Sequence, residues 1–79
     1  MIIKILGTGC KNCENLTKNT KIALEETGIP AEIIKVTDLL DIAAHGVMST
    51  PGLVIDELVV SQGKVLSPKD IGALLKKHS

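Results

Sequence analysis

Apolar residues follow two different spacings along the chain, and each spacing predicts one kind of secondary structure. Short apolar runs bounded by glycine or turn residues predict strands over residues 2–6, 31–37, 53–55 and 58–60. Segments in which apolar or small residues recur every three or four positions predict helices over residues 11–27, 39–44 and 68–79. We therefore expect the element order β-α-β-α-β-β-α.

Residues at the ends of the predicted helices support their boundaries. Gly28 and Pro30 end the first helix, because neither residue continues a helix well. Asp38 and Ser67 can each accept a hydrogen bond from the first turn of the helix that follows. The apolar stripe of the first helix consists of Cys13, Leu16, Thr20, Ala23, Leu24 and Thr27.

The element order predicts an α/β fold with a mixed sheet of four strands flanked by helices. The polar pair Asp56 and Glu57 joins the last two strands as a tight hairpin. A chain of 79 residues is too short for two independent cores, and its 44% hydrophobic and 23% charged residues are ordinary for a globular protein. We expect a single domain over residues 1–79.

Composition excludes two classes of function. The chain has no Phe, Tyr or Trp for stacking on bases, and its nine Lys and Arg are balanced by nine Asp and Glu. We therefore expect no nucleic-acid partner. The apolar run at residues 1–6 is far shorter than the roughly 20 residues of a membrane span, and it lacks the basic region of a signal peptide. We expect no membrane association and a cytoplasmic location.

Two cysteines, Cys10 and Cys13, lie at the predicted junction of the first strand and the first helix. In a reducing compartment this spacing indicates redox chemistry or metal binding. The N–H groups at the helix start, together with Lys11, would stabilise a thiolate. Our hypothesis is that Cys10 attacks a substrate disulfide and that Cys13, one turn further on, resolves the mixed disulfide.

The chain resembles the thioredoxin and glutaredoxin superfamily, and within it the small archaeal and bacterial redox-active disulfide proteins. The resemblance covers essentially the full chain and lies in Gly9-Cys10-Lys11-Asn12-Cys13, Thr50-Pro51-Gly52 and Gly63-Lys64-Val65. It implies a thioredoxin-like fold of glutaredoxin size. It also implies that Pro51 is cis and faces the cysteine pair, and that the backbone of Thr50 contacts an extended substrate.

The resemblance implies a thiol–disulfide oxidoreductase that takes part in electron transport and cell redox homeostasis. Its partners would be a disulfide-containing protein and either a reductase or a small thiol as electron donor. We expect no cofactor, no metal and a monomer. The tryptophan and the Gly-Pro pair usual around a thioredoxin CxxC are absent, as are the buried acid of the preceding strand and the second glycine that helps glutaredoxins hold glutathione.

Two alternative functions use the same residues. The CxxC pair could carry a soft metal such as copper or zinc, although a metal-carrying domain of this length has a different element order. The chain could instead be a non-catalytic interaction module that keeps the fold. His45 and His78 lie too far from the cysteines in sequence for a zinc finger, and an apolar patch around Val47, Met48 and Leu53 could serve as a docking face.

Overall fold

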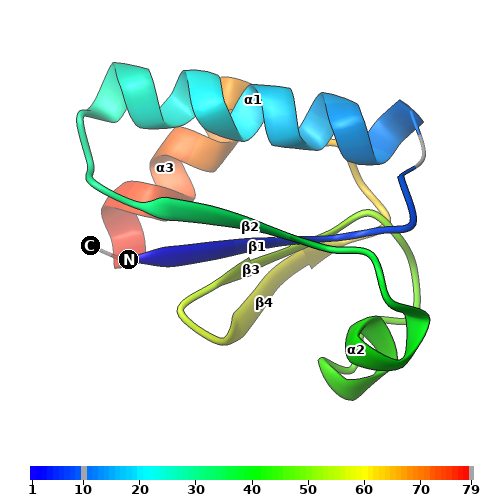
Figure 1. The fold of residues 1–79 in the computed structure, drawn as a ribbon. Helices are drawn as coiled ribbons and strands as arrows, with labels where there is room; N and C mark the ends of the chain where they lie inside the picture. The colour runs from blue at the N-terminus through cyan, green and yellow to red at the C-terminus, as the bar shows by residue number, and fades with distance from the viewer. Residues whose placement is uncertain (10, 79) are drawn as a thin grey trace.

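The seven predicted elements are present in the predicted order. The structure is a computed structural model that describes residues 1–9 and 11–78. Its elements are β1 (Ile2–Leu6), α1 (Lys11–Thr27), β2 (Glu32–Val36), α2 (Leu39–Ala44), β3 (Gly52–Ile55), β4 (Leu58–Gln62) and α3 (Pro68–His78). Figure 1 shows α1 and α3 on one face of the sheet and α2 beyond the other face, near one end.

The four strands form one mixed sheet in the order β2-β1-β3-β4. β1 runs parallel to β2 and antiparallel to β3, and β3 runs antiparallel to β4. The long helix α1 makes the crossover that two parallel strands require. β1 and β3 therefore occupy the centre of the sheet, and every residue of β3 is buried.

Apolar side chains pack on both faces of the sheet. Ile3 and Ile5 point toward α1 and α3, whereas Leu6 points toward α2, because side chains alternate along a strand. The larger cluster, beneath α1 and α3, contains Ile3, Ile5, Leu16, Ala23, Leu53, Ile55, Ile71 and Leu75. The smaller cluster, beside α2, contains Leu6, Ile42, Val47 and Val54.

The buried face of α1 includes two threonines. Thr20 belongs to the predicted stripe, whereas Thr17 does not, and both are almost fully buried. Each hydroxyl donates to the carbonyl four residues earlier, Thr17 to Cys13 at 3.0 Å and Thr20 to Leu16 at 2.8 Å. These bonds satisfy the hydroxyls inside the core, so threonine can replace an apolar residue on the buried face.

The ends of some strands differ from the sequence predictions, whereas the predicted helix cap and hairpin turn are confirmed. β2 is one residue shorter at each end than residues 31–37, and β4 continues beyond residue 60 because Gln62 pairs with Gly52. The cap predicted at Asp38 is confirmed: its Oδ1 accepts from the N–H of Leu40 at 2.8 Å. The hairpin turn at residues 56–57 is also confirmed, and both residues adopt a positive φ.

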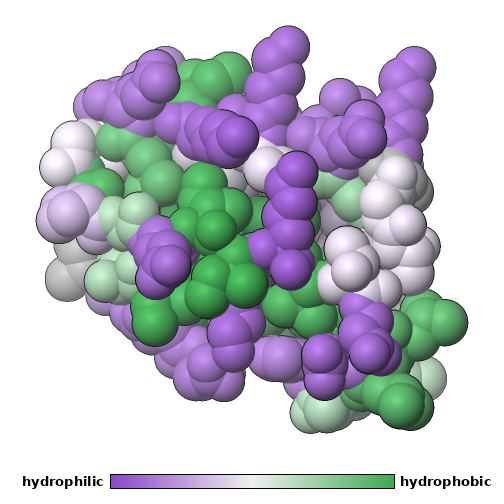
Figure 2. All heavy atoms as spheres, viewed as in Figure 1, coloured by the Kyte–Doolittle hydropathy of each residue, from purple (hydrophilic) through white to green (hydrophobic). Residues whose placement is uncertain are grey.

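The predicted apolar patch around Val47, Met48 and Leu53 is wrong. Leu53 is buried in the larger cluster and Val47 in the smaller one. Only Met48, which is 92% exposed, lies on the surface. Leu53 is buried because β3 is a central strand and its side chain packs in the cluster beneath α1 and α3. Figure 2 shows apolar surface at the position of α2, where Leu39 and Leu40 are exposed.

Candidate functional site

The end of β1 and the start of α1 bring Cys13 against the backbone of Gly7. Cys13 lies in the first turn of α1, is 5% exposed and is disulfide-bonded. A Cβ atom added to Gly7 would overlap the Cys13 sulfur and would lie 3.1 Å from the Cys13 Cβ. Residue 7 must therefore be glycine for Cys13 to keep this position. The prediction for Cys10 as nucleophile falls outside the described residues.

The segment containing Thr50 and Pro51 reaches the same end of the sheet. The Thr50–Pro51 peptide bond is cis, as the resemblance implies. Leu6 pairs with Gly52 in the antiparallel ladder. Gly7, which follows Leu6, and Pro51, which precedes Gly52, therefore lie at the same end of the sheet. Pro51 is buried and its carbonyl accepts from the N–H of Gly63 at 2.9 Å, whereas Thr50 is exposed.

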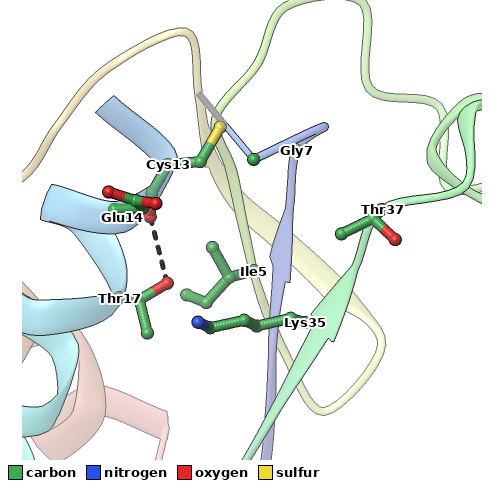
Figure 3. A pocket seen from close by; sticks show the side chains of 8 residues that line it. Ile5, Gly7, Cys13, Glu14, Thr17, Lys35 and Thr37 are labelled. Carbon is green, nitrogen blue, oxygen red and sulfur yellow. Dashed lines mark hydrogen bonds between the residues drawn. The ribbon is translucent and has the colours of Figure 1, made fainter. Parts of the chain in front are cut away.

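A pocket of about 240 Å³ opens beside Cys13, between α1 and the strands β1 and β2. Figure 3 shows the Cys13 sulfur near Gly7, the Ile5 side chain between α1 and β1, and Lys35 reaching from β2 toward α1. Glu14 lines the pocket from the helix side. Sequence reasoning missed both charged residues, because they lie on different elements, Glu14 on α1 and Lys35 on β2. Lys35 reaches the pocket through the pairing of β2 with β1, which places it opposite Ile5.

Within residues 1–9 and 11–78, no group of three or more His, Cys, Asp or Glu side chains is arranged to hold a metal ion. Over the same part of the chain, no helix combines the length and apolar character needed to cross a membrane.

A charged cluster occupies the sheet face opposite α1. Lys4 donates to a carboxylate oxygen of Glu57 at 2.7 Å, and its Nζ lies 3.5 Å from Nε2 of His45. Nδ1 of His45 lies 2.7 Å from the carbonyl oxygen of Asp41, which can only accept. Nδ1 is therefore the protonated nitrogen, and Nε2 is free to accept from Lys4.

The pKa of Glu57 is held below its ordinary value, first by the hydrogen bond from Lys4 and then by the charge of Lys4. A carboxylate with a depressed pKa stabilises the fold above its unfolded-state pKa, and this contribution is lost as pH falls through the folded-state pKa. We expect Lys4→Met to raise the pKa of Glu57 and to weaken the acid-range pH dependence of unfolding. An NMR titration of the Glu57 carboxyl measures this, with Lys69→Met as control; an unchanged titration midpoint would refute it.

Comparison with known proteins agrees with this architecture. Residues 1–76 match the family model of the thioredoxin domain. The thioredoxin of Methanocaldococcus jannaschii is 45% identical over 78 residues, which are 99% of this chain and 90% of that protein. The thioredoxin of Methanothermobacter thermautotrophicus is 40% identical over 75 residues, which are 95% of this chain and 97% of that protein.

Solved structures with little sequence similarity share the fold. A structure described as that of a malarial protein has a TM-score of 0.70 at 20% identity, covering 98% of this chain and 94% of that one. A structure of thioredoxin-2, a component of malaria parasite protein secretion machinery, has a TM-score of 0.69 at 22% identity, covering 98% and 82%. These similarities establish an α/β thioredoxin-like fold. With the family match and the archaeal relatives, they show that the chain belongs to the thioredoxin domain family, a family of thiol–disulfide oxidoreductases.

Proposed function

We propose that this chain is a thiol–disulfide oxidoreductase in which Cys10 and Cys13 alternate between dithiol and disulfide. The observation that carries the proposal is the environment of Cys13: a disulfide-bonded sulfur, almost fully buried in the first turn of α1 and packed against a residue that has no side chain. The sequence contains two cysteines, so an internal disulfide of Cys13 requires Cys10.

In the reductive direction, the thiolate of Cys10 attacks one sulfur of a substrate disulfide and the other substrate sulfur leaves as a thiolate. The thiolate of Cys13 then attacks the Cys10 sulfur of the mixed disulfide. This second step forms the Cys10–Cys13 disulfide and releases the second substrate thiolate. Two electrons pass from the protein to the substrate, and each released thiolate takes a proton from water.

Residues Thr50 and Pro51 shape the surface that receives the substrate. Two observations support this role: both residues lie at the same sheet end as Gly7, and Thr50 is exposed. We propose that the backbone of Thr50 pairs with an extended segment of a disulfide-containing protein.

After the substrate has been reduced, a reductase or a small thiol returns electrons to the protein. The protein acts as a single thioredoxin-like domain over residues 1–79, as a monomer, in the cytoplasm.

The non-catalytic and metal-carrier alternatives have no specific support among the relatives, which are thioredoxins. The proposed role of Cys13 as resolving cysteine predicts a result that neither alternative predicts. In Cys13→Ser, the mixed disulfide on Cys10 has no internal thiol to release it. We expect a one-to-one covalent adduct to accumulate when this variant, in its reduced form, meets a disulfide-containing protein.

Intact-mass spectrometry under non-reducing conditions detects this adduct, and dithiothreitol should cleave it by reducing its disulfide. The wild-type protein is the matched control, because its Cys13 should clear the adduct within the same interval. The proposed roles would be wrong if Cys13→Ser formed no adduct, or if wild type and variant accumulated it equally.

A further inference from the structure

The first two residues of α2, Leu39 and Leu40, form an exposed leucine pair. Their exposed fractions are 68% and 80%. Within α2 only Ile42 is buried, so the leucine pair adds nothing to the core. Isolated exposed apolar residues are common, but two adjacent leucines without a packing role indicate a surface that binds a partner.

The leucine pair adjoins the sheet end that carries the proposed substrate surface. The N–H of Gly7 donates to the carbonyl of Val36 at 2.9 Å, which fixes the end of β2 beside the end of β1. Leu39 follows Val36 by three residues, so their Cα atoms lie within about 11 Å of each other. Figure 1 shows α2 at the same end of the sheet as the start of α1.

One extended segment is long enough to reach both Thr50 and the leucine pair. β1 lies between β2 and β3, so the strand ends at Val36 and Gly52 are two strand spacings apart, about 10 Å. Five or six residues of extended chain span about 17–20 Å, enough for this distance and the further step to Leu39. A protein bound at Thr50 can therefore place a nearby side chain on the leucine pair.

The surroundings of the leucine pair are acidic. Asp38 and Asp41 flank it in sequence, one on each side, and both are exposed. The sequence has no Lys or Arg between residues 36 and 63, and within the described residues the ion pair of Lys4 with Glu57 involves neither aspartate. The local charge is therefore negative although the net charge of the chain is zero. A basic side chain complements this surface.

We propose that the leucine pair and Asp41 select the substrate. The substrates are disulfide-containing proteins that carry an apolar side chain and a Lys or Arg within about five residues of the reacting cysteine. The leucine pair receives the apolar side chain, and the carboxylate of Asp41 pairs with the cation. This inference rests on the proposed function and names its substrate class.

Four peptides test this selection. Each contains one cysteine, joined by a disulfide to 5-thio-2-nitrobenzoate and flanked on both sides by either leucine or serine and by either lysine or glutamate. The thiolate of Cys10 attacks the peptide sulfur, because thionitrobenzoate has the lower pKa and leaves more readily. The colour of the released thionitrobenzoate gives the rate for reduced wild type and for each reduced variant.

The two halves of the surface have separate variants. Leu40→Ser should slow the two leucine peptides by about three- to tenfold and leave the two serine peptides unchanged, because only leucine loses apolar contact. Asp41→Asn should slow the two lysine peptides by about two- to fivefold and should not slow the glutamate peptides. The effect of Asp41→Asn should fade at high salt, whereas that of Leu40→Ser should persist.

Leu58→Ser and Glu25→Gln are the matched controls. Leu58 is 54% exposed and pairs with Ile55, at the end of the sheet opposite Gly7. Glu25 is exposed near the end of α1. Neither control should change the rate with any of the four peptides.

Equal slowing of all four peptides by Leu40→Ser would mean a general disturbance of the site, and no slowing would mean that no substrate contacts the leucine pair. Either result would overturn the proposal. An Asp41→Asn variant that treats lysine and glutamate peptides alike would overturn it as well.

A second copy of this chain is another possible occupant of the leucine pair. Sedimentation velocity over a range of protein concentrations tests it, and wild type and Leu40→Ser should both sediment as monomers. A wild-type dimer that Leu40→Ser dissociates would assign the leucine pair to self-association and would overturn the proposal.

The variant Cys10→Ser separates this inference from the function on which it rests. If reduced wild type releases thionitrobenzoate no faster than reduced Cys10→Ser, the oxidoreductase function itself is wrong. If wild type is faster, but neither Leu40→Ser nor Asp41→Asn changes its preference among the peptides, only the substrate selection is wrong.

Discussion

The variant Gly7→Ala is expected to destabilise the oxidised protein by about 1–3 kcal/mol, the usual cost of forcing an extra methyl group into a packed site. The added Cβ would overlap the Cys13 sulfur, which is held by its disulfide. Reduction frees that sulfur to move, so the reduced form should lose less stability. The disulfide of the variant should therefore be reduced more easily than that of the wild type.

Chemical denaturation of both redox forms measures this difference, and Gly72→Ala is the matched control. Gly72 lies inside α3, where an added Cβ meets only the Thr27 methyl at an ordinary 3.5 Å. Alanine there should stabilise the fold by about 0.5–1 kcal/mol, because glycine is a poor helix former. Equal stability of wild type and Gly7→Ala in the oxidised form would contradict the close packing of Gly7 against Cys13.

The variant Cys10→Ser is expected to abolish catalytic reduction of protein disulfides. A serine hydroxyl is not a thiolate at neutral pH and cannot form the mixed disulfide, while Cys13 is buried away from a protein substrate. The loss should bring the rate down to that of dithiothreitol alone. Turbidity from reduced insulin, with dithiothreitol as donor, follows the reaction without needing a tryptophan in the enzyme.

Lys21→Met, an exposed change on the same helix, serves as the control for Cys10→Ser and should keep the wild-type rate. The thermal unfolding of Cys10→Ser should be compared with that of the reduced wild type, so that a folding defect is not mistaken for lost chemistry. A folded Cys10→Ser protein that still reduces insulin at the wild-type rate would contradict the role of Cys10 as the nucleophile.

Sequence pattern was sufficient for the elements because the signals are local. Glycine and proline end α1, and Asp38 caps α2 through a hydrogen bond within its own first turn. The order of strands was not accessible in the same way. β3 pairs with β1, a contact between residues roughly fifty positions apart in sequence, and this pairing buries Leu53.

The cysteine pair and the Thr50–Pro51 segment were accessible because each is a contiguous motif. The pocket was not, because Glu14 lies on α1 and Lys35 on β2, and both line one pocket only once β2 has paired with β1 in register. The burial of Thr17 was not predicted for a related reason. Its burial depends on a hydrogen bond to the Cys13 carbonyl, which a scale of residue hydropathy does not describe.

An equilibrium titration of the thiols in redox buffers of known potential tests the central claim most directly. Free thiols are alkylated and counted by mass, with metal ions chelated throughout. The account predicts a reversible two-electron transition that joins Cys10 to Cys13 at a potential between about −300 and −120 mV. If no intramolecular disulfide forms across that range, the thiols are metal ligands or inert residues, and the oxidoreductase function proposed for this chain is wrong.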